Sequence, residues 1–387
     1  MNQVEWAVPD GERFEQIASN LHATFDLNGD GLPDLVNAGN YVDFEAYGSP
    51  GERYWRVFLN DGSGFGPEQQ WQVPDGERFE QVASNLHATF DLNGDGLPDL
   101  VNAGNYADFE AYGFPGERYW RVFLNEGGGF GPEQQWPVPD GERFEQIASN
   151  LHATFDLNGD DLPDLVNAGN YADFEAYGSP DERYWRVFLN DGSGFGPEQQ
   201  WPVPDGQRFE QIASNLHATF DLDGDGLPDL VNAGNYADFE AYGPPGERYW
   251  RVFLNDGSGF GLEQQWPVPD GERFEQIASN LHATFDLDGD GFPDLVNAGN
   301  YADFEAYGSP GGRYWRVFLN EGDGFGAELE WPVPDGERFE QIASNLHSTF
   351  DLDGDGLPDL VNAGNYADFE AYGSPGEHYW RVFLSVR

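Results

Sequence analysis

The sequence predicts an all-β fold, a six-bladed β-propeller with four antiparallel strands in each blade. Two observations predict it. A unit of 65 residues recurs along the chain with few substitutions, and each unit consists of short apolar runs separated by turn sequences rich in glycine, proline and aspartate. Four-stranded units repeated several times are typical of propellers. The tryptophans that mark the repeat are Trp6, Trp71, Trp136, Trp201, Trp266 and Trp331.

The repeat makes the whole chain, residues 1–387, one predicted domain. Repeated units share a continuous core, so the length of the chain does not indicate several domains. The predicted blades are residues 6–70, 71–135, 136–200, 201–265, 266–330, and 331–387 together with 1–5.

Four strands are expected in the first unit, and the other units repeat them. They lie around Ala23–Leu27, Asp34–Ala38, Tyr54–Asn60 and Phe65–Val73, the last of which crosses into the next unit. Aromatic and β-branched residues support the third strand most strongly. Apolar residues have helical spacing only over Glu12–Asn20, and the turn-rich unit around that segment disfavours a helix there.

The two ends of the chain predict a closed ring. Gln3–Trp6 aligns with Glu68–Trp71, so the N-terminus carries a copy of the strand that the last unit lacks. This segment is expected to pair with Tyr379–Leu384 and to complete the sixth blade. Closure would cover both terminal strand edges, which otherwise invite aggregation. The alternative is an open solenoid, which usually needs distinct capping repeats.

The charge of the chain limits its partners. It carries 70 acidic residues against 18 basic ones, a formal net charge of −52. Phosphate binding needs a positive surface, so nucleic acid and anionic membranes are not expected partners. No apolar run approaches the roughly 20 residues of a spanning helix, so no membrane insertion is expected. Acidity without any lysine fits an extracellular or cell-surface location, although the N-terminus has no signal peptide.

An acidic loop within each unit has the spacing of a calcium site. In the first unit the side chains of Asp26, Asn28, Asp30 and Asp34 and the carbonyl of Leu32 supply oxygens at positions 1, 3, 5, 9 and 7. Calcium prefers six to eight hard oxygen ligands, and water would complete this set. Because strands flank the loop and the bidentate glutamate of a helical EF-hand is missing, a β-hairpin calcium loop is predicted.

The same positions recur in all six units, so about six Ca²⁺ ions are expected, one per repeat. The other predicted ligands are Asp91, Asn93, Asp95, Leu97 and Asp99; Asp156, Asn158, Asp160, Leu162 and Asp164; Asp221, Asp223, Asp225, Leu227 and Asp229; Asp286, Asp288, Asp290, Phe292 and Asp294; and Asp351, Asp353, Asp355, Leu357 and Asp359.

The alternative is a turn held by side-chain to backbone hydrogen bonds without metal. Several carboxylates within nine residues repel each other unless a cation lies between them, which favours calcium. Two differences between copies matter. Units four to six have aspartate where units one to three have asparagine at position 3, so tighter binding is expected there. Asp161 replaces the glycine of position 6, which is expected to cost about 1 kcal/mol if that residue needs a positive φ.

These motifs resemble the FG-GAP/VCBS repeat family over nearly the whole chain. The resemblance is carried by Gly64-Phe65-Gly66, by the acidic loop, by Leu35-Val36 and by Tyr54–Asn60. It implies a propeller like those of integrin heads, fungal lectins and the repeat regions of large secreted toxins, with structural calcium in the loops. Seven blades are the commonest number among such proteins, so six is a departure. The near-identity of the copies suggests recent amplification, or a designed or trimmed chain.

The predicted function is a calcium-binding, multivalent binding module, namely a lectin or adhesion propeller, with glycans or a surface protein as partner. Six equal weak sites can give strong avidity on a repetitive surface. Tryptophans such as Trp55 are expected to pack between blades, and Arg56 to pair with an acidic neighbour. The tyrosines of a long predicted loop, Tyr41–Arg53 in the first unit, are the better ligand-binding candidates: Tyr47, Tyr112, Tyr177, Tyr242, Tyr307 and Tyr372.

Two other interpretations stay open. The ring can be a structural scaffold of a larger secreted or toxin-like protein, or an amplified or designed repeat without a ligand. A carbohydrate-active enzyme would have to use His22 or the pair Asp43 and Glu45, but six copies of every group favour binding over catalysis, and no enzyme is predicted. The oligomeric state is left as a monomer or a domain-swapped oligomer, because near-identical blades can exchange between chains.

Overall fold

The computed structural model describes the strands, the acidic loops and most of the hairpins of the chain. The described residues are 1–9, 26–37, 47–49, 51–74, 91–102, 112–114, 116–139, 156–167, 177–179, 182–204, 221–232, 242–244, 246–269, 286–297, 307–309, 312–333, 351–362, 372–374 and 376–386. The predictions that concern Glu12–Asn20, His22, Asp43 and Glu45 fall outside these residues.

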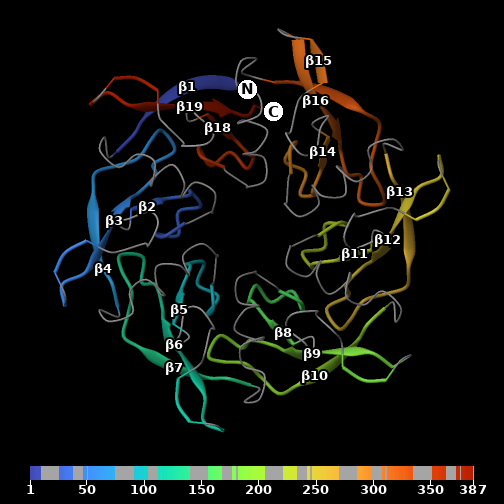
Figure 1. Cartoon of the computed structure of the whole chain (residues 1–387), viewed down its shortest axis with the longest axis horizontal. Coiled ribbons are helices and arrows are strands. Elements are labelled where there is room, and N and C mark those ends of the chain that lie inside the picture. The colour runs from blue at the N-terminus through green and yellow to red at the C-terminus, as the bar shows by residue number, and fades with distance from the viewer. Residues whose placement is uncertain are drawn as a thin grey trace.

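Six small antiparallel sheets make up the described structure, and no helix is present among the described residues. Figure 1 shows the sheets side by side around a common centre. Sheet 1 contains β2 (Leu35–Asn37), β3 (Tyr54–Phe58) and β4 (Gln69–Gln72); sheet 2 contains β5 (Leu100–Asn102), β6 (Tyr119–Phe123) and β7 (Gln134–Pro137); sheet 3 contains β8 (Leu165–Asn167), β9 (Tyr184–Phe188) and β10 (Gln199–Pro202); sheet 4 contains β11 (Leu230–Asn232), β12 (Tyr249–Phe253) and β13 (Gln264–Pro267).

The last two sheets differ in their strands. Sheet 5 contains β14 (Leu295–Asn297), β15 (Tyr307–Ser309), β16 (Gly312–Phe318) and β17 (Leu329–Pro332). Sheet 6 contains β18 (Leu360–Asn362), β19 (Tyr379–Leu384) and β1 (Asn2–Ala7). The first strand of the chain therefore lies in the same sheet as the last, and Trp6 stands opposite Trp380, as the alignment of the two ends predicted.

The strands agree in part with the predicted ones. The third predicted strand is β3, the central strand of sheet 1, and the second is β2. The fourth begins later than expected, at Gln69, because Phe65 lies in the hairpin and forms only an isolated bridge with Asn60. Of the first predicted strand, Asp26 and Leu27 are not in a strand, and the rest lies outside the described residues.

The fourth strand that the structure does show is in a different place. In sheet 5 the strand β15 pairs with β16 through Tyr307 and Tyr314. The equivalent residues of sheet 1, Tyr47 and Tyr54, form an isolated bridge with the same two backbone hydrogen bonds. Each sheet therefore has a short edge segment, a strand in sheet 5 and an isolated bridge in the others, in addition to its inner strand.

The core lies between neighbouring sheets. Alternation in β3 buries Trp55 and Val57, and Trp55 stands directly opposite Trp71 on β4. Both tryptophans belong to a buried cluster that also contains Leu100 and Phe123 of sheet 2. The prediction that Trp55 packs between blades is confirmed.

Five junctions between neighbouring sheets use a wedge and a clasp in the described part of the chain. The wedge is a phenylalanine at the tip of a hairpin: Phe130 of sheet 2 packs edge-on against Trp55 and Trp71 of sheet 1, with ring centroids 5.9 and 5.8 Å apart. The clasp is a buried asparagine: Asn125 donates from Nδ2 to the carbonyl oxygen of Leu27, 2.9 Å away. The equivalent clasps join Asn60 to Leu352, Asn190 to Leu92, Asn255 to Leu157, and Asn320 to Leu222.

Sheet 1 contacts sheet 6 through the same two devices. Phe65 lies with its ring centroid 5.5 Å from Trp6 and 6.1 Å from Trp380, and the clasp from Asn60 reaches Leu352. A shared apolar cluster contains Leu35 of sheet 1 and Trp380 of sheet 6. The beginning and the end of the chain are therefore joined by side-chain contacts as well as by the pairing of β1 with β19, and both termini lie close together in Figure 1. None of the described residues forms a helix that could span a membrane.

Candidate metal centre

Six acidic loops, one preceding each inner strand, meet at the centre of the molecule. They surround a cavity of about 740 Å³ that is lined in every loop by the aspartate of position 1, the residue of position 6 and the proline of position 8. In the first loop these are Asp26, Gly31 and Pro33. The loops lie on the inner side of the sheets in Figure 1. The repeat thus places six copies of the same acidic motif around one axis.

The aspartate of position 1 folds its own loop. The carboxylate of Asp26 accepts hydrogen bonds from the backbone N–H groups of Gly29, Asp30 and Gly31, at 2.7, 3.0 and 2.7 Å. Gly29 and Gly31 have φ of 78° and 86°, a region that residues with a Cβ rarely adopt. Leu27 is 1% exposed, so its side chain lies in the core. The turn-forming hydrogen bonds of the metal-free alternative are therefore present in the structure.

The aspartate of position 9 connects the loop to the sheet. Asp34 is 1% exposed, and its two carboxylate oxygens accept the N–H groups of Leu27 and Asn60, at 2.9 and 2.8 Å. Burial raises the pKa of Asp34 to about 7, and the negative charges of Asp30 and Asp26 act in the same direction. The same rise to about 7 holds at Asp99, Asp164, Asp229, Asp294 and Asp359.

Positions 1, 3 and 5 bring three carboxylates together where all three are aspartate. One oxygen from each of Asp221, Asp223 and Asp225 lies within 4.8 Å of the others. The sets of Asp286, Asp288 and Asp290 and of Asp351, Asp353 and Asp355 are equivalent. In the first loop the amide of Asn28 takes the middle place and donates to Asp30 at 3.0 Å. The repeated aspartate triplets are positioned to hold a metal ion.

Unpartnered oxygens in these triplets fit a cation. In the part of the chain that the structure describes, Oδ1 of Asp223 and Oδ1 of Asp353 are buried and have no hydrogen-bond partner. A buried carboxylate oxygen without a donor is costly unless a positive charge faces it. Burial and the neighbouring carboxylates raise the pKa of Asp223, which shows that the arrangement disfavours negative charge in the absence of an ion. The carbonyl of position 7 stays a predicted ligand.

The buried carboxyl of position 9 predicts how the metal-free protein responds to pH. Its pKa is about 7 in the folded chain against an ordinary value of 3.8, so the folded state binds this proton more tightly than the unfolded state does. The stabilisation is complete below about pH 4 and is lost as the pH rises through about 7. We expect the free energy of unfolding, measured by denaturant titration in chelator, to fall from about pH 5 to about pH 7.5. Replacing Asp34→Asn should remove one sixth of the position 9 contribution; a flat pH profile would contradict the prediction.

Asp161 provides a test of loop strain. Its φ is 66°, and among the described residues it alone has a positive φ without being glycine, as its place at position 6 predicted. Asp161→Gly is expected to stabilise the metal-free protein by about 1 kcal/mol, because glycine adopts this conformation without the Cβ penalty. The reverse change Gly226→Asp, at the same position of the fourth loop, should cost a similar amount. Denaturant titration of both variants checks the pair, and equal midpoints would refute it.

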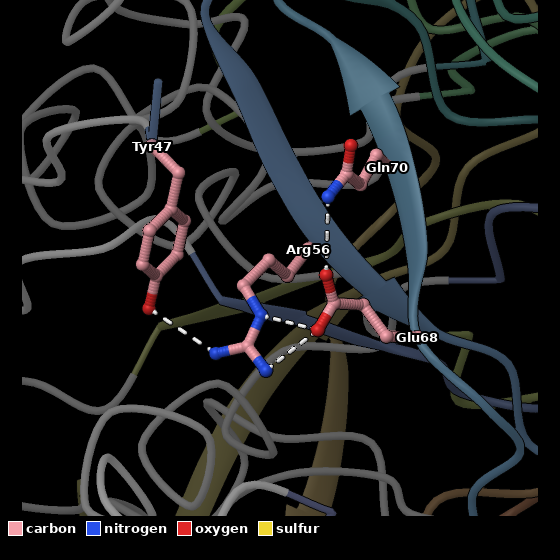
Figure 2. A network of polar contacts seen from close by, with 4 residues as sticks. All are labelled: Tyr47, Arg56, Glu68 and Gln70. Atoms are coloured by element: carbon pink, nitrogen blue, oxygen red, sulfur yellow. Dashed lines mark hydrogen bonds and ion pairs between the residues drawn. The ribbon is translucent and has the colours of Figure 1, made fainter.

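The candidate tyrosine of sheet 1, Tyr47, lies in a polar network with Arg56, Glu68 and Gln70 (Figure 2). Tyr47 stacks on Tyr54 with centroids 5.8 Å apart, and the guanidinium of Arg56 lies 5.3 Å from the centre of the Tyr47 ring. Arg56 forms an ion pair with Glu68 at 2.7 Å and donates from Nη1 to the Tyr47 hydroxyl at 3.5 Å. Gln70 donates to the same glutamate at 3.4 Å.

This network confirms the predicted acidic partner of Arg56 and identifies it as Glu68. The pair recurs in sheets 2 to 5, as Arg121 with Glu133, Arg186 with Glu198, Arg251 with Glu263, and Arg316 with Glu328. In sheet 6 Arg381 donates to Gln3 at 3.3 Å instead. Gln70 stands opposite Arg56, and Glu68 lies two residues before Gln70, within the diagonal reach of a long side chain across a hairpin. The spacing in the sequence could therefore have indicated Glu68. The ligand-binding role of the tyrosines stays a prediction.

Comparisons with known proteins agree with the repeat. The model of a family described as FG-GAP-like repeat matches residues 26–102, 91–167, 156–232, 221–297 and 286–362. Human integrin alpha-7 is 31% identical over 172 residues, which is 42% of this chain and 13% of the integrin, so the chain spans a small part of that relative. A chain in the structure of the Photorhabdus luminescens Tc holotoxin pore superposes with a TM-score of 0.53 and 19% identity, over 99% of this chain and 14% of that one.

Proposed function

Because this chain belongs to the FG-GAP-like repeat family, we propose that it is a closed, six-bladed, calcium-binding β-propeller that serves as a multivalent binding module. The observation that carries the calcium proposal is the set of three converging carboxylates with buried, unpartnered oxygens at Asp223 and Asp353. Calcium suits such a site because it takes hard oxygen ligands in flexible geometry. The wedge and clasp contacts between sheets 6 and 1 support closure of the ring.

Calcium would act here as a structural ion. The carboxylates of positions 1, 3 and 5 would hold it, with position 9 behind them, and its positive charge would offset their mutual repulsion. Position 1 already orients its carboxylate through three backbone N–H groups of its own loop. The loops are therefore largely formed before the ion arrives, which lowers the ordering cost of binding.

Calcium titration by isothermal calorimetry tests this proposal. We expect about six ions per chain in two groups, because loops four to six carry aspartate at position 3 and loops one to three carry asparagine. The aspartate loops should bind more tightly. Asp225→Asn, at an exposed carboxylate of loop four, should weaken one tight site, whereas Asn28→Asp should move one weak site into the tight group. Six equivalent sites would contradict the ranking, and no bound calcium would contradict the proposal.

The binding surface of this module is proposed to be the network of Tyr47, Arg56 and Glu68 together with its counterparts in the other sheets. Tyr47 and its counterparts are each half-buried and lie beside a guanidinium, which in sheets 1 to 5 is paired with a glutamate. These groups can bind a sugar by stacking and hydrogen bonds. Repetition around the ring would add avidity on a repetitive glycan surface outside or at the surface of the cell. A glycan array, read with and without chelator, distinguishes the uses. Bound glycan supports a lectin, and hydrolysed glycan supports an enzyme. An array in which glycan is neither bound nor hydrolysed supports a scaffold.

A scaffold is the second candidate function. The similarity to the Tc holotoxin chain extends over 99% of this chain but 14% of that one, so an equivalent fold is one part of a much larger polypeptide there. A ring without a ligand of its own would bind calcium equally well. A chain that binds six calcium ions but retains no glycan in the array would favour this candidate.

A further inference from the structure

The first three acidic loops have an asparagine followed by a glycine at positions 3 and 4. This pair of residues occurs nowhere else in the chain, and its three copies are Asn28-Gly29, Asn93-Gly94 and Asn158-Gly159. Glycine has no side chain to shield its backbone nitrogen, so this nitrogen can reach the side-chain amide of the asparagine before it. Loops four to six have aspartate at position 3 instead. The chain therefore contains the amide form and the acid form of one and the same loop.

The reaction open to such a pair is the loss of ammonia, since asparagine is one of the labile residues of proteins. The glycine nitrogen forms a bond to Cγ of the asparagine, the bond from Cγ to Nδ2 breaks, and the proton of the glycine nitrogen leaves with Nδ2 as ammonia. The five-membered imide that results then takes up one water. Breaking its bond between the nitrogen and Cγ yields aspartate, whereas breaking its bond between the nitrogen and the main-chain carbonyl carbon yields isoaspartate.

Hydrogen bonds in the folded loop engage both reacting groups. The N–H of Gly29 donates to Oδ1 of Asp26 at 2.7 Å, and a carboxylate at this place opposes the negative charge that the nitrogen must acquire to attack. The amide of Asn28 is held by Asp30, whose N–H it accepts at 3.1 Å and to whose carboxylate it donates at 3.0 Å. Loops two and three have the same three bonds. The loop must therefore open before ammonia can leave.

The reacting pair lies where water can reach it. Gly29 is exposed and Asn28 is half-buried, and the same holds for their counterparts in loops two and three. The clasp asparagines contrast with them, because each is 2% exposed or less and is followed by aspartate or glutamate. They are Asn60, Asn125, Asn190, Asn255 and Asn320. The chain thus carries its own set of asparagines that should not react.

Loop three should open more readily than loops one and two. Its position 6 is Asp161 with φ of 66°, whereas Gly31 and Gly96 stand there in the other two loops with φ of 86° and 84°. The hydrogen bond at position 6 is unchanged, since the N–H of Asp161 reaches Asp156 at 2.7 Å as that of Gly31 reaches its own aspartate. Strain of the left-handed backbone is released when the loop opens, which favours the open form of loop three about fivefold.

We propose that Asn28, Asn93 and Asn158 are deamidation sites, at which opening of the acidic loop lets the chain lose ammonia and so change how strongly that loop binds a cation. Aspartate at position 3 would complete the set of three carboxylates that loops four to six already have, with oxygens within 4.8 Å of one another. Isoaspartate would lengthen the main chain by one carbon at position 3, so the spacing of positions 1, 3 and 5 would be lost. The change in cation binding rests on the proposed calcium function, whereas the loss of ammonia does not.

The test follows each asparagine of the complete chain by mass spectrometry. The protein is kept in mildly alkaline buffer with calcium or with chelator and then digested, and each peptide is quantified in its amide, aspartate and isoaspartate forms. We expect the three loop asparagines to convert while the five clasp asparagines stay amides, and the released ammonia to approach three molecules per chain. Calcium at ten times the dissociation constant of a loop should slow conversion there about tenfold, because the bound ion favours the closed loop.

Two variants at position 6 test whether loop opening controls the rate. In the unaltered chain Asn158 should convert about five times faster than the asparagines of loops one and two. Asp161→Gly should remove this difference and leave the other two rates unchanged. The matched change Gly96→Asp puts the same strain into loop two and should speed conversion of Asn93 by a similar factor. If Gly96→Asp fails to fold, Asp161→Gly decides, because it replaces a strained residue by one that adopts the same conformation freely.

Three results would overturn the proposal. They are conversion of the loop asparagines no faster than that of the clasp asparagines, an unchanged rate at Asn158 in Asp161→Gly, and equal rates in the folded chain and in the chain unfolded by denaturant. Equal rates in calcium and in chelator, with Asn158 still converting first, would support the modification and count against calcium in these loops. Failure of this inference and failure of the proposed calcium function are therefore separate outcomes.

Discussion

Chelation of divalent ions is expected to lower the thermal unfolding midpoint of this protein by about 20 °C. An ion at 100 times its dissociation constant adds about 2.7 kcal/mol of stability, and six such ions act together. Removing them also leaves three carboxylates facing one another in each of the last three loops. Differential scanning calorimetry in calcium and in chelator measures the change.

The controls separate metal from ionic strength. Adding back calcium should restore the midpoint, and the same concentration of magnesium should restore less of it, because magnesium demands stricter octahedral geometry and releases water reluctantly. Sodium chloride at equal ionic strength should have a small effect. A midpoint that is the same in chelator and in calcium would mean that the loops are held by their backbone hydrogen bonds alone.

Loss of one buried position 9 carboxylate is expected to cost about 2 to 6 kcal/mol of unfolding free energy. Asp229 accepts the N–H of Leu222 from its own loop and that of Asn255 from the hairpin that follows β12. Asp229→Ala leaves both buried donors without a partner, each at a cost of about 1 to 3 kcal/mol. Denaturant titration should show this loss in calcium and in chelator alike.

The matched control for that variant lies in the same loop. Asp225 is exposed and belongs to the triplet, so Asp225→Ala should destabilise the protein in calcium and much less in chelator. If Asp229→Ala destabilised the protein in calcium only, position 9 would be a ligand without a structural role of its own. The two aspartates thus separate the metal function of the loop from its backbone function.

The sequence predicted the repeat unit, the pairing of β1 with β19 and the place of β3, because each depends on local pattern or on alignment of copies. It did not predict that Phe65 belongs to a turn. Phenylalanine is itself a strand-forming residue, but the ring of Phe65 packs on tryptophans of another sheet, and a local pattern carries no information about that contact.

The candidate site was predicted in its residues and only partly in its geometry. The spacing of Asp221, Asp223 and Asp225 correctly indicated convergence. The hydrogen bond from Asn255 to Asp229 spans 26 residues, and the central cavity is formed by six distant loops, so neither follows from one repeat read alone. The roles of His22, Asp43 and Glu45 concern residues outside the described part of the chain.

The wedge and the clasp have an evolutionary consequence. Because each filled junction uses the same phenylalanine, tryptophan pair and asparagine, any sheet can stand beside any other with its contacts unchanged. A duplication or deletion of one 65-residue unit would therefore preserve these contacts between neighbouring sheets. A change in the number of units would then need no new interface between sheets.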